Sequence, residues 1–214
     1  MRKINKVSAK RQESERQERR DRILTAAKIV FFKKGYIRTT MRDIALGAEL
    51  SPGLLYHYFD NKDDIYGQIC EEGFHIMIDT MAKADTNGKT TQAKLEILAL
   101  AYVSFYMNYP EYFEIIFFTE FGYKRVGLND RVEERLNRMS LQAFLMLNDV
   151  VLEAMSDGTI QHHENSWEIT LSLWASVEGV IFIHKRGYLE TYNLEIGQLL
   201  DRQIAILADG IRQG

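Results

Sequence analysis

The stretch TMRDIALGAELSPGLLYHYFDNK, residues 40–62, predicts two short helices joined by a tight turn. Thr40 is a suitable N-cap for the first helix, and Asp43 complements the N-terminus of that helix. Ser51 caps the second helix, and Pro52 occupies its first position, where a missing N–H costs nothing. Two short helices in this arrangement form a helix-turn-helix, whose second helix enters the major groove of DNA.

The second of these helices carries side chains suited to contacting DNA. Gly53 permits close approach to the groove, Tyr56 offers a hydroxyl to phosphates, and His57 can bond phosphates or base edges. Leu55 and Phe59 share one face of the helix and are expected in the core. The helical spacing of Tyr58 relative to Leu55 and Phe59 is compatible with a position in the core and equally with a contact to DNA. Arg42 and Lys62 flank the motif with positive charge.

The distribution of charge supports a polyanionic partner for the front of the chain. Residues 1–62 hold fifteen Lys and Arg against seven Asp and Glu, whereas the remainder holds twelve against twenty-three. The net charge of -3 hides this separation. Basic N-termini also occur as solvated tails, so the charge gains meaning only together with the motif.

Helical spacing of apolar residues continues along the rest of the chain and predicts an all-α fold. We expect a flexible basic arm over residues 1–15, a helix-turn-helix DNA-binding domain over 16–62, and an effector-binding and dimerisation domain over 63–214. The first helix is expected to end at Gly35, and a long helix to run from 62 to 82. Further helices are expected near 90–109, 111–121, 128–156, 165–186 and 194–212.

The stretch RILTAAKIVFFKKGYIRTTMRDIALGAELSPGLLYHYFDNKDDIYGQI, residues 22–69, closely resembles the TetR family of transcription regulators. The resemblance implies a homodimer formed through the last two helices, an effector pocket in the C-terminal domain, and binding to double-stranded operator DNA. The resemblance implies that eight residues contact operator DNA: Thr40, Arg42, Gly53, Leu54, Tyr56, His57, Tyr58 and Lys62. We add Ser51, the N-cap of the second helix, to these expected DNA-binding residues.

Two residues depart from the pattern of the family. Glu49 stands where members usually have glycine in the turn, at a position that requires a positive φ and costs other residues about 1–2 kcal/mol. Leu54 stands where a small polar residue is common, and it can read a thymine methyl or pack against sugar. The operator sequence of relatives therefore does not transfer to this chain.

The C-terminal half is rich in aromatic residues, most of which are expected in a helical core. An apolar cavity with a few polar groups is the usual site for a small molecule, so we expect some of them to line an effector pocket. The residues expected there are Tyr102, Phe105, Tyr106, Phe117, Phe121, Phe144, Trp174 and Glu178. The residues expected at the dimer interface are Trp167, Leu171, Val180, Ile181, Leu199 and Ile206, although burial within the subunit explains any one of them equally well.

The expected function is a DNA-binding transcription regulator, by default a repressor that a hydrophobic or aromatic small molecule releases from a palindromic operator. One alternative is a ligand-independent DNA-binding or protein-interaction factor with the same fold. Another is an enzyme, which the absence of a phosphate loop, a nucleophile elbow or a carboxylate pair disfavours. We expect no cofactor and no metal site, and we interpret His162, His163 and Glu164 as a solvated loop. The single cysteine, Cys70, and the lack of a membrane-spanning stretch indicate a cytoplasmic protein.

Overall fold

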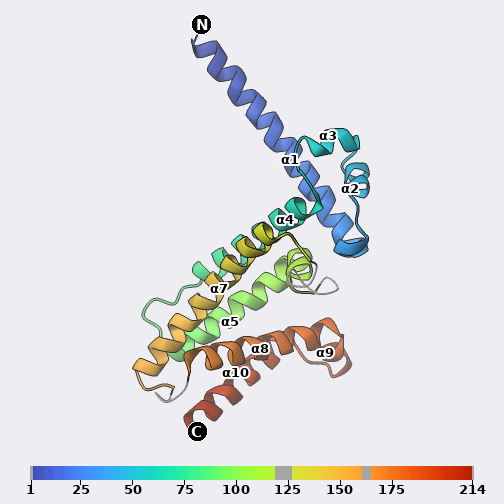
Figure 1. Ribbon diagram of the computed structural model, residues 1–214. Helices are drawn as coiled ribbons and strands as arrows, with labels where there is room; N and C mark the ends of the chain where they lie inside the picture. The colour runs from blue at the N-terminus through green and yellow to red at the C-terminus, as the bar shows by residue number, and fades with distance from the viewer. Residues whose placement is uncertain (1, 119–126, 161–164, 214) are drawn as a thin grey trace. The chain divides into compact units, whose positions relative to one another are not determined.

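The computed structural model describes residues 2–118, 127–160 and 165–213, and within these residues the chain forms helices and no strands, as expected (Figure 1). The chain divides into two compact units. Unit 1 comprises Met1–Gly73 and Glu111–Asn137, and unit 2 comprises Phe74–Pro110 and Arg138–Gly214. Unit 1 thus includes a segment from well beyond residue 62, where the sequence suggests a domain boundary.

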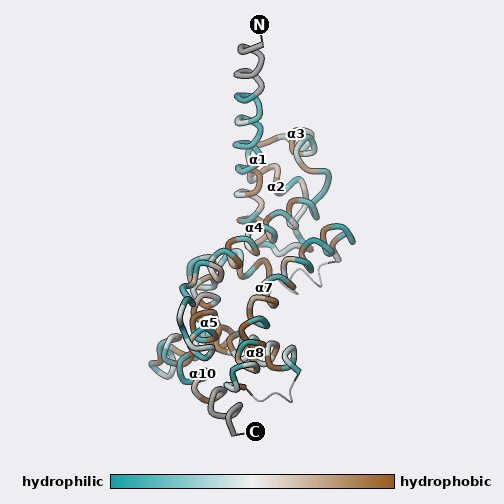
Figure 2. Tube along the Cα trace, turned by 90° about the vertical axis from the view of Figure 1, so that its left-hand side faces the viewer, coloured by the Kyte–Doolittle hydropathy of each residue, from teal (hydrophilic) through white to brown (hydrophobic). Residues whose placement is uncertain are grey.

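The first helix, α1 (Arg2–Arg38), includes residues 2–15, for which the sequence predicts a flexible arm. Because neither glycine nor proline precedes Gly35, nothing in the sequence interrupts this helix, and pairs such as Arg11 Nε to Glu15 Oε1 at 3.0 Å support its exposed turns. Gly35, with φ 73°, breaks the helical geometry at the residue where the sequence predicts the end. The N-terminal half of α1 extends beyond α2 and α3 (Figures 1 and 2).

The helix-turn-helix forms as predicted, with α2 (Met41–Gly47) and α3 (Pro52–Tyr56) beside the C-terminal half of α1. In the turn between them, the Leu50 N–H donates to the Ala45 carbonyl at 2.9 Å. Glu49 has a φ of 58°, as the resemblance to the TetR family implies for this position. The helices enclose a small apolar core, whose members are below 4% exposed: Ile23, Ala27, Phe31, Ile44, Ala45, Leu55 and Phe59.

The long helix α4 (Lys62–Ala82) contributes its first part to unit 1. There it packs against α6 (Pro110–Phe113), the π-helical turn η1 (Glu114–Phe118) and the start of α7 (Asp130–Ser156). Close approach requires glycine at two positions: a Cβ on Gly67 would lie 2.5 Å from Val132 Cγ1, and one on Gly73 would lie 2.6 Å from Ile116 Cδ1. Glycine at these positions therefore sets how closely the 111–137 segment approaches α4.

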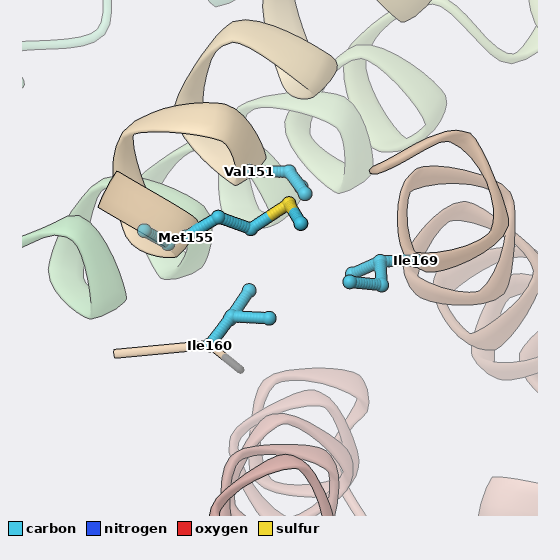
Figure 3. Packing of buried hydrophobic residues seen from close by; sticks show 5 residues of the cluster. Val151, Met155, Ile160 and Ile169 are labelled. Carbon is cyan, nitrogen blue, oxygen red and sulfur yellow. The ribbon is translucent and has the colours of Figure 1, made fainter. Parts of the chain in front are cut away.

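Unit 2 contains the rest of α4 and α7, together with α5 (Thr91–Asn108), α8 (Ser166–Lys185), α9 (Tyr188–Thr191) and α10 (Ile196–Gln213). Asn165 caps α8 by accepting from the Trp167 N–H at 3.0 Å. In one apolar cluster, side chains from α7, the following turn and α8 point toward one another: Val151, Met155, Ile160 and Ile169 (Figure 3). This cluster anchors the end of α7 to the start of α8.

By length and composition alone, α8 is long and apolar enough to cross a membrane, which the sequence analysis did not anticipate. The helix carries two acidic residues, Glu168 and Glu178, and ends with Lys185. Part of its apolar surface is buried in unit 2, including Val177, Val180 and Ile181. Core helices of globular proteins satisfy the same criterion, so it does not by itself indicate a membrane span.

Candidate nucleic-acid interface and effector site

The two hydroxyl groups at the starts of α2 and α3 serve as helix caps. Thr40 Oγ1 accepts from the Asp43 N–H at 3.2 Å, and the Asp43 carboxylate accepts in return from the Thr40 N–H at 3.0 Å. Ser51 Oγ accepts from the Leu54 N–H at 3.2 Å. Lys34 Nζ lies 2.7 Å from Asp43 Oδ1, and together with Thr40 it lowers the pKa of this carboxyl to about 2. Thr40 and Ser51 thus define where the two helices begin.

Six of the predicted DNA-binding residues are exposed: Thr40, Arg42, Ser51, Gly53, Tyr56 and His57. Tyr56 is 54% exposed, so its ring and hydroxyl are accessible to a partner. A Cβ built on Gly53 meets no atom within 4 Å, so packing within the protein does not require glycine there. Glycine in a helix costs up to about 1 kcal/mol relative to alanine.

The remaining predicted residues, Leu54, Tyr58 and Lys62, are partly buried. Lys62 Nζ donates to the Tyr36 carbonyl at 2.8 Å and lies 4.1 Å from the centre of the Tyr36 ring. Burial lowers the pKa of this ammonium group. Lys62 therefore ties the start of α4 to the end of α1, a structural role that the sequence analysis did not anticipate.

Arg20 of α1 contacts the residues that follow α3, and the sequence analysis did not identify it. Its guanidinium donates from Nη1 to the Tyr58 carbonyl at 3.1 Å and lies 4.4 Å from the centre of the Phe59 ring. These contacts hold a positive charge beside the predicted DNA-binding residues. The sequence indicated only that this part of α1 is rich in basic residues, and nothing distinguished Arg20 from its neighbours.

Within unit 2, four of the residues expected to line an effector pocket come together. The Tyr102 hydroxyl donates to Glu178 Oε1, and the Trp174 side chain hydrogen-bonds Tyr102. The ring of Phe144 meets Trp174 edge-on, with ring centres 5.2 Å apart. These contacts join α5, α7 and α8 around one mixed polar and aromatic cluster.

The other expected pocket residues are placed differently. Tyr106 bonds His184 Nδ1 at 2.8 Å, a partner that the sequence analysis missed, and Phe105 is fully buried. Phe117 belongs to unit 1, where its ring lies 4.9 Å from that of Phe113. Phe121 lies outside the described residues, as do His162, His163 and Glu164. Within the described residues, no group of three or more His, Cys, Asp or Glu side chains forms a candidate metal site.

The expected dimer residues divide into exposed and buried sets. Trp167, Leu171 and Ile206 are 36%, 48% and 57% exposed, and Leu199 is partly buried. Val180 and Ile181, by contrast, face the interior of unit 2 and are 3% and 0% exposed. The apolar positions of α8 that face outward are Trp167, Leu171, Ala175, Phe182 and Ile183, together with Gly179. The helical pattern correctly indicated an apolar stripe on α8, but it did not reveal which side faces inward.

Two family profiles match the chain. Residues 23–69 match "Bacterial regulatory proteins, tetR family", and residues 95–207 match "Tetracyclin repressor-like, C-terminal domain". The second match alone spans more than half of the chain. Together the two matches cover the helix-turn-helix and most of the helical region that follows it.

Among curated proteins, the HTH-type transcriptional regulator HbdR of Aromatoleum sp. (strain CIB) is 49% identical over 49 residues. This alignment covers 23% of the chain and only 21% of HbdR, so the chain spans about a fifth of that relative. Two solved structures share the fold across most of the chain. A tetR-family regulatory protein from Rhodococcus RHA1 has a TM-score of 0.73 and 18% identity, covering 90% of this chain and 96% of the other. FadR from Bacillus subtilis in complex with stearoyl-CoA has a TM-score of 0.71 and 18% identity, covering 89% and 98%.

Proposed function

Because the chain belongs to the tetR family of bacterial regulatory proteins, we propose that it is a cytoplasmic transcriptional repressor that binds a palindromic operator as a homodimer and leaves it when a small molecule binds. The observation that carries this proposal is the exposed surface of α3. Tyr56 and His57 project from a helix held by caps at both helix starts, and Gly53 leaves room for a partner to approach. An exposed, rigidly held helix of this kind suits the major groove.

A homodimer is supported by the outward apolar face of α8. Leu171, Phe182 and Ile183 are 48%, 44% and 37% exposed, and Gly179 among them lets a second helix approach closely. We assign this face to the partner subunit rather than to lipid, because α8 packs with α10 as part of unit 2. In a symmetric dimer the two α3 helices would lie about 34–36 Å apart and enter successive major grooves.

Release by a ligand requires that the ligand bind one arrangement of the DNA-binding helices better than another. Helix α4 belongs to both units and is suited to transmit such a difference. In unit 1, the segment 111–137 holds α4 through an ion pair between Arg135 Nε and Glu71 Oε1 at 2.6 Å and a bond from the Asn129 N–H to Asp63 Oδ2 at 2.9 Å. A shift of this segment would therefore act directly on α4, the helix that follows the proposed DNA-binding helix α3.

The effector site is proposed to lie in unit 2 at the cluster of Tyr102, Phe144, Trp174 and Glu178. This cluster combines aromatic surface with a few polar groups, as small-molecule sites commonly do. The Bacillus subtilis FadR structure holds stearoyl-CoA, which supports ligand sensing by this fold without naming the ligand of this chain.

The proposal is tested by selecting bound DNA from random sequence and measuring affinity for the selected operator by fluorescence anisotropy. Tyr56→Ala should weaken binding at least about tenfold, or about 1.4 kcal/mol, because it removes an exposed contact with DNA. Its melting temperature should not change, since Tyr56 is 54% exposed.

The matched control is Tyr192→Ala in unit 2, which removes a tyrosine that is 71% exposed and should leave the affinity unchanged. Failure to select any DNA sequence, or equal affinity of Tyr56→Ala and wild type, would contradict the proposed function.

A further inference from the structure

Glu178 of α8 is a partly buried carboxylate without a cationic partner among the described residues. It accepts a hydrogen bond from the hydroxyl of Tyr102, which is itself only 7% exposed. No described Lys, Arg or His forms an ion pair with it, and burial raises the pKa of its carboxyl above the ordinary value. Carboxylates removed from water are normally paired with a cation, since an uncompensated charge is costly. Glu178 therefore has unused capacity to accept hydrogen bonds or to balance a positive charge.

The Tyr102 hydroxyl links this carboxylate to a chain of aromatic side chains on α5, α7 and α8. Trp174 precedes Glu178 by one turn of α8 and bonds the same Tyr102 hydroxyl, and Phe144 of α7 meets the Trp174 ring at 5.2 Å. The faces of aromatic rings attract cations, and tryptophan does so most strongly. A carboxylate and several rings at one place thus suit a ligand that is both apolar and positively charged.

The charge of unit 2 favours the same class of ligand. The residues of this unit include thirteen Asp and Glu against eight Lys and Arg. Within its aromatic cluster, the ionisable side chains are the acids Tyr102 and Glu178. An anionic ligand such as an acyl-CoA would bring its phosphates into a negative field without a basic side chain from this cluster to meet them.

We propose that the effector is a hydrophobic cation, whose charge lies against the Glu178 carboxylate and whose apolar body lies against Trp174 and Phe144. The inference rests on the proposed function, because it names the class of ligand for the proposed effector site. It also distinguishes this chain from the Bacillus subtilis regulator whose structure contains stearoyl-CoA.

The test uses two probes of the same shape and opposite charge, tetraphenylphosphonium and tetraphenylborate, with stearoyl-CoA as a third. Tetraphenylphosphonium should raise the melting temperature of the full-length protein and release it from its selected operator, whereas the two anions should do neither. Glu178→Gln keeps the shape and an oxygen to accept from Tyr102, but it should weaken tetraphenylphosphonium binding at least tenfold. The matched control is Glu168→Gln, which removes an exposed carboxylate from the same helix and should leave binding unchanged.

The outcomes separate this inference from the proposed function. In one outcome, the protein binds its operator while only an anionic probe stabilises it and releases it from DNA. That result would overturn the inference of a cationic effector but would leave the proposed repressor function intact. The inference is likewise overturned if tetraphenylphosphonium does not bind, or if it binds Glu178→Gln as tightly as wild type. If Glu178→Gln is monomeric in sedimentation while wild type is a dimer, the carboxylate acts at the subunit interface and the inference also fails. Absence of any operator would instead remove the proposed function.

Discussion

At the scale of single residues, the proposed DNA contacts include a position that the protein's own packing does not require. Gly53 is exposed, and a side chain there would meet no other atom of the protein. At Glu49 the requirement is internal: the turn needs a positive φ of 58°, which glutamate adopts less readily than glycine. Glycine at position 53 weakens the helix and has no packing role, which supports the proposed approach of DNA at this position.

Replacing Gly53 with alanine should therefore separate stability from DNA binding. Alanine is favoured over glycine in a helix by up to about 1 kcal/mol, so the free energy of unfolding in urea should stay equal or rise. Affinity for the operator should fall, since the added methyl group occupies the space through which DNA approaches. Equal affinity of Gly53→Ala and wild type would show that the glycine does not face DNA.

The Glu178 carboxyl predicts a dependence of stability on pH. Its pKa in the folded protein is raised above the ordinary 4.5, so the wild type loses stability as the pH rises through the raised pKa. The described titratable side chain that contacts it is the Tyr102 phenol, which stays protonated throughout this range. In the free protein, Glu178→Gln should gain stability relative to wild type between pH 4 and pH 7. A constant difference in melting temperature over this range would show that the carboxyl titrates normally.

At the scale of elements, α4 depends on close packing against the start of α7. Gly67 faces Val132, which is fully buried, and an added Cβ would lie only 2.5 Å from Val132 Cγ1. A polar contact reinforces the same helix, since the Tyr66 hydroxyl donates to the Ile115 carbonyl at 2.6 Å. The position of α4 is thus set by tertiary packing, not by its own helical propensity.

Gly67→Ala should lower the free energy of unfolding by about 1–3 kcal/mol, because overpacking forces the two helices apart. Val132→Ala removes the atom that would clash, so the double variant should lose less stability than the sum of the two single variants. Urea denaturation of the four proteins provides the complete cycle. Strictly additive losses would indicate that the two helices already tolerate the extra methyl group.

At the scale of the whole molecule, positive charge is concentrated in residues 1–62, the part of the chain for which we propose DNA binding. Residues 2–12 include five basic residues and no acidic residue, and they belong to the helix α1 rather than to a separate element. The N-terminal half of α1 extends beyond α2 and α3 (Figure 1), and we propose that its basic residues contact DNA phosphates beside the operator.

Deleting residues 2–12 should weaken operator binding mainly at low salt. If all five cations meet phosphates, the deletion should make the slope of log affinity against log salt less steep by up to about 4.5 per subunit. Anisotropy titrations between 50 and 200 mM salt measure this slope, and the selected operator in scrambled form serves as the control for sequence preference. A loss of affinity that is the same at every salt concentration would contradict an electrostatic role.

Local signals in the sequence suffice to predict the helix-turn-helix, because the caps at Thr40 and Ser51 act over three residues. The turn conformation at Glu49 was implied only by the resemblance to the TetR family. The tertiary structure alone decided contacts between distant parts of the chain. It paired Glu178 with Tyr102, turned Val180 and Ile181 inward, and joined residues 111–137 to the N-terminal helices. Such contacts depend on which faces of the helices meet, and amphipathic periodicity gives the spacing of a face but not its partner.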